Sequence, residues 1–323
     1  MNPGVKASCQ QLLAAYKGKK VNYFGERLQF EGVDQRDVYN ITAPFVDGGE
    51  LVIAGRVEDR ESEDSQVIFF RERDGKWFPK EDAPTFRLQD PFVTWIGGEL
   101  IFGGVEIFPH PENEGCLQWR TLFYRGSDLN NLRCFAVGPD GMKDLRLVEL
   151  TDGKIGVFTR PQGEVGGRGT IGFFKIPSLA ALTIENIERA RLLENQFLPE
   201  EWGGANEVHL LKNGLLGVLG HIACFSADNY RHYYSMVFPF DPEQESAGPM
   251  EIIACREDFP KGPAKNQKLV DVLFSGGLCR NNDGTVTLYV GVSDAEAHRI
   301  TIPDPFLKYE RMEGGISSTG LKG

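Results

Sequence analysis

The sequence predicts an all-β protein and, within that class, a five-bladed β-propeller. Two observations predict the class: from Val21 onward, short runs of Val, Ile, Phe and Leu alternate with Gly, Asp and Asn, and helical periodicity is scarce. A third observation predicts the architecture. One hairpin pattern, in which a glycine turn separates two apolar runs, occurs five times along the chain, as expected of propeller blades.

Length and composition limit the function classes. A chain of 323 residues with 38 glycines and 11% aromatic residues can bury a sizeable core, and we expect one domain over residues 1–323. Residues 1–20 are a lead-in, and residues from about 305 to 323 are a tail. The net charge of −11 argues against nucleic acid or an anionic membrane as a partner, because both need a basic surface.

The cysteines predict the cellular compartment. They lie far apart, without a CxxC pair or the spacing of metal ligands, so we expect no metal and reduced, mostly buried thiols in a cytoplasmic protein. These residues are Cys9, Cys116, Cys134, Cys224, Cys255 and Cys279. The lead-in has only a short apolar patch, and no run approaches the ~20 apolar residues of a membrane span. We therefore expect neither a signal peptide nor a membrane-spanning segment.

Taken in order, the elements begin with a helix over Ser8–Tyr16. Five hairpins then cover most of the chain: Tyr39–Arg56, Arg87–Glu106, Asp144–Arg160, Asn206–His221 and Phe274–Gly291. Their turn glycines are roughly 50 to 70 residues apart, which suits blades with variable loops. Between the third and fourth hairpins, Ser178–Glu194 fits either one face of a helix or a connecting loop with one helical turn.

Polar residues recur at the end of each hairpin that lies away from its glycine turn. Because strands rise by ~3.3 Å per residue, positions about eight before and seven after the turn glycine lie side by side. An all-β protein with unrelated glycine-turn hairpins is the alternative, but it gives no reason for this repeated placement. We expect the polar ends to converge on a central funnel, where propellers bind ligands. The predicted ring consists of Asn40, Arg56, Asp90, Asp144, Arg146, Arg160, Asn206, Glu207, His221 and Asp294.

Carboxylates and cations gathered in one funnel suit a hydroxyl-rich ligand together with an anion. Taken singly, these residues also have structural interpretations. Arg56 and Arg160 fit structural ion pairs, His221 fits a buried imidazole with a hydrogen-bond partner, and Asp144 fits a blade-edge pair with Lys143. Only the ring as a whole indicates a ligand site.

Five groups of short motifs resemble a known family. They are Tyr39-Asn40 with Gly55-Arg56; Gln89-Asp90-Pro91 followed by Ile96-Gly97-Gly98; Lys143-Asp144 with Thr159-Arg160-Pro161; Leu219-Gly220-His221; and Tyr289-Val290-Gly291-Val292-Ser293-Asp294. The set resembles the mannoside phosphorylases of glycoside hydrolase family 130. It is more similar still to the related β-1,2-mannan phosphorylases and mannosyltransferases of glycosyltransferase family 108, once a domain of unknown function. The likeness rests on the order and blade-by-blade placement of the motifs, from about Tyr39 to Asp294.

The resemblance implies a reversible reaction. The family cleaves β-mannosides, here expected to be β-1,2-linked mannooligosaccharides, with inorganic phosphate, and inversion at the anomeric carbon gives α-mannose 1-phosphate. The reverse reaction is mannosyl transfer from the sugar phosphate. Asp90 matches the general acid, which in many members acts through the 3-hydroxyl of the bound mannose.

The resemblance also implies roles for the other ring residues. His221 and Arg160 match phosphate-binding positions, and we group Arg146 with them. The residues expected to bind the mannoside are Asn40, Arg56 and Asp294, which match family positions, and Asp144, Asn206 and Glu207, which belong to the predicted ring.

The chemistry favours phosphorolysis over two alternatives. A phosphorylase needs one acid and a cationic cradle, because phosphate is already an anionic nucleophile. One prominent carboxylate, Asp90, stands among several cations, and phosphate is then a co-substrate with no further cofactor. An inverting hydrolase needs a second carboxylate to activate water, for which Glu207 or Asp294 is available. A non-catalytic glycan-binding propeller is the third class. The sequence leaves the linkage, the chain length, a nucleotide-sugar donor and the oligomeric state open.

Some segments depart from the family pattern. Leu219 stands before Gly220-His221 where the family commonly has Tyr, and Phe92 follows Asp90-Pro91 where it usually has Arg, which puts one sugar or phosphate contact in question. Asn229–Tyr234 fits an acceptor-sugar platform or a phosphate contact, and more readily a packed strand. Gly163–Gly169 lacks the context of a nucleotide loop, and we expect a mobile loop over the funnel.

Overall fold

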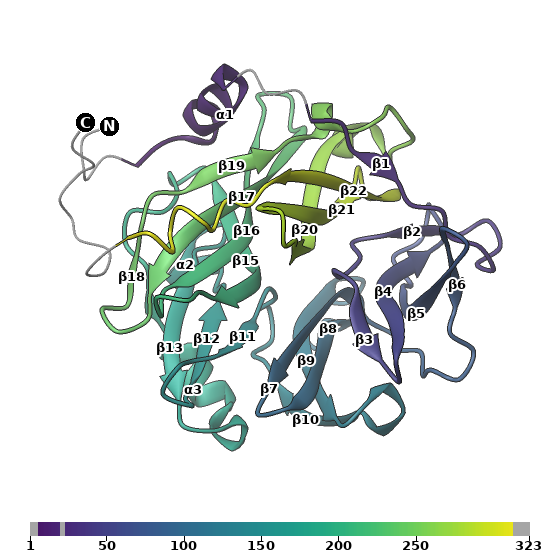
Figure 1. Cartoon of the computed structure of the whole chain (residues 1–323), viewed down its shortest axis with the longest axis horizontal. Helices are drawn as coiled ribbons and strands as arrows, with labels where there is room; N and C mark the ends of the chain where they lie inside the picture. Colours follow the sequence, from purple (N-terminus) through teal and green to yellow (C-terminus); the bar gives the residue numbers. More distant parts are fainter. Residues whose placement is uncertain (1–5, 20–22, 313–323) are drawn as a thin grey trace.

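The computed structural model describes residues 6–19 and 23–312, and most of them lie in antiparallel β-strands arranged in sheets around a common centre (Figure 1). The predicted lead-in helix is α1 (Cys9–Gly18). It begins with a capping box, in which the Ser8 hydroxyl accepts from the Gln11 N–H and the Gln11 side chain accepts from the Ser8 N–H. Cys9 and Leu12 fix the helix to the core beside β16 and β19.

The first two groups of strands are formed by residues 37–79 and 89–137. The first contains β2 (Asp37–Tyr39), β3 (Phe45–Asp47), β4 (Glu50–Glu58), β5 (Gln66–Arg73) and β6 (Lys76–Pro79). The second contains β7 (Gln89–Ile96), β8 (Glu99–Pro109), β9 (Leu117–Gly126) and β10 (Arg133–Val137), with the 3₁₀ turn η1 (Leu129–Asn131). Phenylalanine side chains from β5 and β8 meet between the two groups.

The third group is formed by residues 146–192, with its strands interrupted by short helices. It contains β11 (Arg146–Glu149), β12 (Ile155–Thr159), α2 (Gly163–Gly166), β13 (Gly172–Ile176), η2 (Leu179–Ala181), α3 (Ile184–Glu188) and β14 (Arg191–Leu192). The connecting-loop interpretation of Ser178–Glu194 is therefore confirmed, and one continuous helix there is wrong. Thr183 caps α3 as a separate turn, and Leu182 before it is outside the helical region with ψ 82°.

The last two groups form a nine-stranded sheet. One contains β15 (Trp202–Leu210), β16 (Leu216–Phe225), β17 (Arg231–Asp241), β18 (Ser246–Ala247) and β19 (Glu251–Ala254). The other contains η3 (Arg256–Asp258), η4 (Gln267–Leu269), β20 (Asp271–Arg280), β21 (Thr285–Val292), β22 (Glu296–Pro303) and, from the other end of the chain, β1 (Glu26–Arg27). A short parallel pairing of β17 with β20 joins the two groups.

The five predicted hairpins are confirmed as β3–β4, β7–β8, β11–β12, β15–β16 and β20–β21. Their turn glycines all have φ between 78° and 85°, a left-handed conformation that glycine adopts without steric cost. The first strands of these hairpins lie towards the centre, where β11 contacts β7 and β15, and β20 contacts β15 and β7 (Figure 1). The polar ends of the hairpins therefore meet around one axis.

The cysteines agree with the sequence only in part. All six are unpaired, and Cys9 and Cys255 are buried as expected. Cys116 and Cys134 are exposed, because one lies in the β8–β9 connection and the other on the edge strand β10. The prediction of mostly buried thiols is therefore wrong for Cys116 and Cys134.

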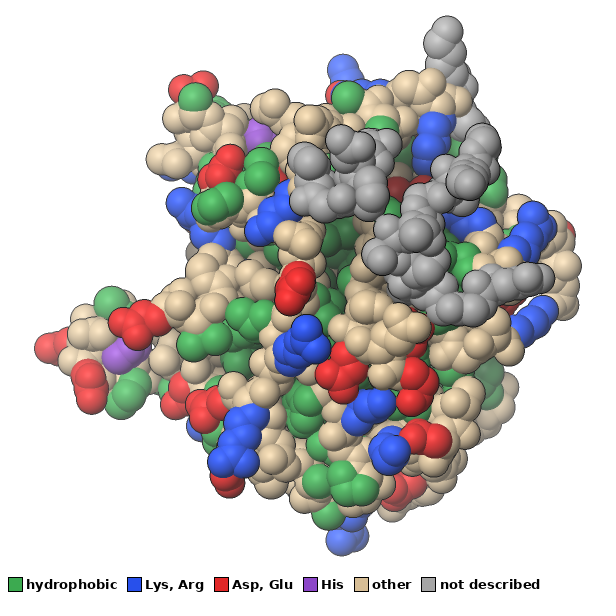
Figure 2. All heavy atoms as spheres, turned by 90° about the vertical axis from the view of Figure 1, so that its left-hand side faces the viewer, with side chains coloured by type: hydrophobic (Ala, Val, Ile, Leu, Met, Phe, Trp, Pro, Cys, Tyr) green, Lys and Arg blue, Asp and Glu red, His purple; other side chains and the backbone are tan. Residues whose placement is uncertain are grey.

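The surface shows mixed charge. On the face shown in Figure 2, acidic, basic and hydrophobic side chains are interspersed, without a broad area of one sign. Among the described residues, no helix has the length and apolar character required to span a bilayer.

Candidate active site

A polar cavity of about 560 Å³ lies where the hairpin ends converge, and we call it the polar cavity. Seven of the ten predicted ring residues line it: Asn40, Arg56, Asp90, Asp144, Arg160, His221 and Asp294. Arg146, Asn206 and Glu207 do not. The structure thus brings together residues from all five groups of strands.

A repeated backbone conformation presents four of these side chains. Asn40, Asp90, Asp144 and Asp294 all have left-handed backbones, with φ of 44°, 48°, 59° and 49°. Asn and Asp adopt this conformation more readily than other residues with a Cβ, although it costs roughly 1–2 kcal/mol each. Such strain persists where the surrounding structure fixes it, often at functional sites. Asn40, Asp90 and Asp144 share this conformation at equivalent positions before the turn glycines of the first three groups, whereas Asp294 adopts it after β21 of the fifth.

Asp90 is buried and held by two donors. Asn40 Nδ2 donates to Asp90 Oδ1 at 2.7 Å, and Arg56 Nη1 lies 3.3 Å from the same oxygen. Burial alone would raise the pKa of Asp90, but the charges of Arg56 and Lys143 and the bond from Asn40 outweigh it and hold the pKa below its ordinary value. Asp90 is therefore ionised at neutral pH when no ligand is bound.

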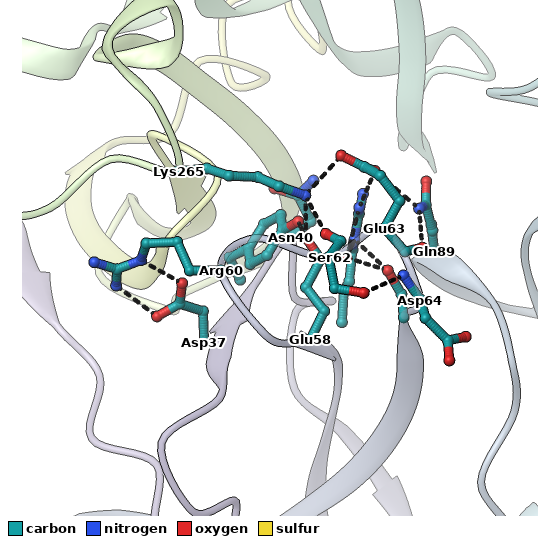
Figure 3. A network of polar contacts seen from close by, with 12 residues as sticks. Asp37, Asn40, Glu58, Arg60, Ser62, Glu63, Asp64, Gln89 and Lys265 are labelled. Atoms are coloured by element: carbon teal, nitrogen blue, oxygen red, sulfur yellow. Dashed lines mark hydrogen bonds and ion pairs between the residues drawn. The ribbon is translucent and has the colours of Figure 1, made fainter.

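Behind Arg56, a polar network closes one side of the cavity (Figure 3). Glu58, whose side chain is fully buried, accepts from Arg56, Tyr39, Ser65 and Lys265. Lys265, from the loop between η3 and η4, also donates to the Ser62 carbonyl and to Glu63, each at 2.8 Å. The network fixes the Arg56 guanidinium against Asp90.

On the opposite side, Arg160 and Asp144 form a buried ion pair. Arg160 Nη1 lies 3.2 Å from Asp144 Oδ2, while Arg160 Nε donates to the Gly203 carbonyl at 2.8 Å. Neither Nη1 nor Oδ2 has a hydrogen-bond partner of good alignment among the described residues. Both atoms are shielded from solvent, so they form an internal pair that holds the Arg160 side chain in the wall of the cavity.

His221 lies beside this pair. A Cβ at Gly204 would come to 3.0 Å from each of His221 Cε1, Asp144 Oδ2 and an Arg160 carbon, so the three side chains close over a position without a side chain. His221 Nδ1 is 2.8 Å from Asn206 Oδ1, and its ring stacks on Tyr233. Burial lowers the pKa of His221 to about 3, which makes the imidazole neutral at physiological pH.

Acid should destabilise the protein through His221. Its pKa is about 3 when folded and 6.5 ordinarily, so between these values the unfolded chain binds a proton there that the folded protein does not. Stability is therefore lost as the pH falls through this range. We expect the midpoint of thermal unfolding, followed by circular dichroism, to fall less between pH 7 and pH 4 in His221→Gln than in the wild type. Asp294 works in the opposite sense in both proteins, so parallel curves would contradict the assignment.

Asp294 differs from Asp90 and Asp144 in the direction in which its pKa is shifted. Burial raises its pKa, the nearby Asp90 adds to this effect, and the charges of Arg56 and Lys265 do not reverse it. The cavity thus holds one carboxyl group whose pKa is raised beside two, Asp90 and Asp144, whose pKa values are lowered.

Three ring residues need correction. A bulge between Ala205 and Glu207 shifts the register of β15, so the Glu207 side chain belongs to a second cavity, and Asn206 lies behind His221. Arg146 lies in the interior between the strands. Its guanidinium donates to the carbonyls of Asn206 and Leu145 and covers the ring of Phe92. Predicted direct contacts of Arg146, Asn206 and Glu207 with a ligand in the polar cavity therefore lack structural support.

The motif departures also have structural explanations. Phe92 is buried against Phe123, so its side chain packs in the core. Gly163–Gly166 forms the short helix α2, and Gly169 lies so close to the Arg160 guanidinium that a Cβ would come to 2.7 Å from it. This segment therefore contacts the Arg160 guanidinium, and the mobile loop that we expected over the funnel stays a prediction.

The sequence missed several lining residues. Lys143 was quoted only as the neighbour of Asp144, yet its charge lowers the pKa of Asp90, Asp144 and His221. Arg231 and Tyr233 were named only within Asn229–Tyr234, for which a packed strand was favoured over a sugar or phosphate contact; they line the cavity from β17, while His232 and Tyr234 bond to Asp271 on the other face. Strand periodicity could have identified this alternation. Lys265 comes from the loop before η4 and Lys268 from η4 itself, and neither short segment gave a signal in the sequence.

Comparisons place these findings among known proteins. A family model described as a protein of unknown function, DUF1861, matches residues 14–308. The structure of MPT-4, a mannose phosphorylase from Leishmania mexicana in complex with a phosphate ion, is 33% identical, with a TM-score of 0.85 over 97% of this chain and 98% of that one. MPT-1, a GDP-Man-dependent mannosyltransferase from the same organism, is 33% identical, with a TM-score of 0.84 over 93% and 95%.

A more distant likeness concerns the fold alone. A β-1,2-mannobiose phosphorylase from Listeria innocua is 15% identical, with a TM-score of 0.59 over 88% of this chain and 92% of that one. No curated protein sequence matches the chain.

Proposed function

The chain belongs to the DUF1861 family, and from its likeness to a mannose phosphorylase and a mannosyltransferase we propose that it is a glycoside phosphorylase acting on β-mannosides. The expected products are α-mannose 1-phosphate and a shortened saccharide, and the reverse reaction is mannosyl transfer. β-1,2-Linked mannooligosaccharides are the proposed substrates. One observation carries the proposal: a buried carboxylate held by Asn40 and Arg56 shares a cavity with the cationic side chains of Lys143 and Arg160.

We infer that the five groups of strands are the blades of one five-bladed propeller within a single domain in the cytoplasm. Support comes from the five repeated hairpins around one centre and from the pairing of β1 with β22, which joins the two ends of the chain in one sheet. The polar cavity would then be the central funnel.

In the proposed reaction, a phosphate oxygen attacks the anomeric carbon while the glycosidic bond breaks on the opposite face. The departing oxygen takes a proton from Asp90, directly or through a hydroxyl of the mannose. Asp90 is ionised in the empty cavity, so it must gain this proton as the substrates bind. A phosphate dianion beside Lys143 and Arg160 offsets the positive charges near Asp90 and so raises its pKa.

The phosphate would lie on the Arg160 side of the cavity. The Arg160 side chain lines the cavity there, and Lys143 adds a second cation. With the side-chain oxygen Oδ1 of Asn206 as the acceptor, His221 carries its proton on Nδ1, and its Nε2 is an acceptor. His221 would therefore accept a hydrogen bond from the hydroxyl of monohydrogen phosphate.

The charge states weigh against an inverting hydrolase. Such an enzyme needs an ionised carboxylate to activate water. Glu207, one candidate, lies outside the polar cavity, and burial beside Asp90 raises the pKa of the other, Asp294, which disfavours the ionised form that such a base needs. Asp144 is already paired with Arg160.

Phosphate dependence tests the function. The protein is incubated with β-1,2-mannooligosaccharides with and without phosphate, and with GDP-mannose plus an acceptor. Mannose 1-phosphate formed only with phosphate supports the proposal. Free mannose in both incubations would show a hydrolase, transfer from GDP-mannose alone would show a nucleotide-sugar transferase, and no turnover would leave a glycan-binding protein.

Asn206 should control the protonation of His221. In Asn206→Asp, a carboxylate accepts from Nδ1 and stabilises the imidazolium, so we expect a higher His221 pKa and a displaced pH profile for phosphorolysis. Asn206→Ala removes the acceptor and should lower kcat/KM for phosphate by about 10- to 100-fold, as loss of a partner that orients a histidine does at metal sites. Nitrogen-15 chemical shifts of the imidazole report the tautomer. Unchanged shifts in both variants would exclude this role.

A further inference from the structure

A second cavity, of about 480 Å³, opens among the first strands of the hairpins, towards their glycine turns, and we call it the rear cavity. Asn206 lies between the two cavities, since it lines the rear cavity and bonds to His221 in the polar cavity. Nothing in the proposed reaction uses the rear cavity.

Its wall is apolar where it meets solvent. Trp95, three residues before the turn at Gly98, is 45% exposed, and Val46 on the neighbouring β3 is 59% exposed. Phe45 and Val93 extend this surface inward. An exposed Trp beside a cavity offers a flat ring on which a ligand can stack, and contiguous apolar surface of this kind marks binding sites.

Polar groups converge on the same cavity. Glu207 Oε2 accepts from the Leu278 N–H at 2.7 Å and lies 2.7 Å from His209 Nε2, and about a fifth of each side chain is exposed. The structure gives Glu207 Oε1 no donor among the described residues. The carboxylate is thus fixed in place with one oxygen available.

These features select the ligand class. Among the described residues, the lining of the rear cavity includes no Lys or Arg that could pair with an anion such as phosphate. A saccharide fits both parts, because the C–H face of a sugar ring packs on an indole while its hydroxyls donate to a carboxylate. A purely apolar ligand would desolvate Glu207 Oε1 without giving it a donor.

We propose that the rear cavity is a second, non-catalytic saccharide site, with Trp95 as the stacking platform and Glu207 as the hydroxyl acceptor. The choice of a mannosaccharide rests on the function proposed above. Such a site holds a long substrate on the protein while its end reacts elsewhere, which raises the local concentration of reactive ends.

Calorimetric titration with β-1,2-linked mannohexaose, without phosphate, tests the proposal. We expect two sites per wild-type chain and one when mannose 1-phosphate saturates the polar cavity. Trp95→Ala should then abolish the remaining site, and Glu207→Gln should weaken it by about tenfold, as loss of a key interfacial contact does. Leu51→Ala is the matched control, since Leu51 is also exposed at 43% but does not line the rear cavity.

Two results of the titration would contradict a second saccharide site. One site in the wild type, or two sites in Trp95→Ala, overturns the proposal. Activity of Trp95→Ala on β-1,2-mannobiose should remain within about twofold of the wild type, as expected of a residue outside the reaction. If the wild type shows no phosphorolysis but keeps the Trp95-dependent site, only the catalytic function is wrong.

Discussion

Replacing Asp90 by Asn should lower the rate of phosphorolysis by about 100- to 10,000-fold, the usual contribution of a general acid. The amide cannot supply the proton that the departing oxygen needs. Asn keeps the shape of Asp90, tolerates its φ of 48°, and can still accept from Asn40 and Arg56. Initial rates of mannose 1-phosphate formation measure the loss.

Substrates with different leaving groups separate acid catalysis from simple damage to the site. The dinitrophenolate group of a dinitrophenyl β-mannoside leaves without protonation. Asp90→Asn should therefore retain most of the wild-type rate on this substrate. Asp294→Asn is the matched control, and it should impair both substrates equally if it only binds sugar. An equal loss on both substrates in Asp90→Asn would rule out Asp90 as the proton donor.

Replacing Arg160 by Gln should damage both phosphate use and stability. We expect kcat/KM for phosphate to fall by about 100-fold or more, since a charge-assisted contact to the anion is lost. Both partners of the Arg160–Asp144 pair are almost fully buried, so removing one leaves an uncompensated carboxylate, at a cost of about 3–5 kcal/mol in unfolding free energy. Steady-state kinetics and urea unfolding measure the two effects.

A double variant distinguishes the two roles of Arg160. Asp144→Asn in the Arg160→Gln background removes the unpaired charge, so stability should recover while phosphate use does not. Arg160→Lys keeps the charge without the guanidinium fork and should give an intermediate KM for phosphate. Recovery of activity along with stability would show that Arg160 serves only the fold.

Local chemistry explains why the sequence predicted the hairpins. A left-handed turn glycine between two apolar runs specifies a hairpin within about twenty residues, and the structure has one at each of the five predicted places. The recurrent Asn or Asp before the turn was visible for the same reason, because a left-handed backbone restricts the residue type locally. Asn40, Asp90 and Asp144 were therefore placed correctly at one cavity.

Contacts between separate repeats were decided by the tertiary structure. The bulge in β15 depends on packing against neighbouring strands, and it moved Glu207 to the rear cavity and Asn206 behind His221. Lys265 reaches the cavity from a loop about two hundred residues away from its partner Glu58. The charge states of the site residues were also decided by the tertiary structure. The sequence by itself determined which residue types stand at the hairpin ends. Burial and cations from distant parts of the chain determined that Asp90 is ionised, that the pKa of Asp294 is raised and that His221 is neutral. The reason is that a pKa depends on every charge nearby and on burial, which only the folded chain defines.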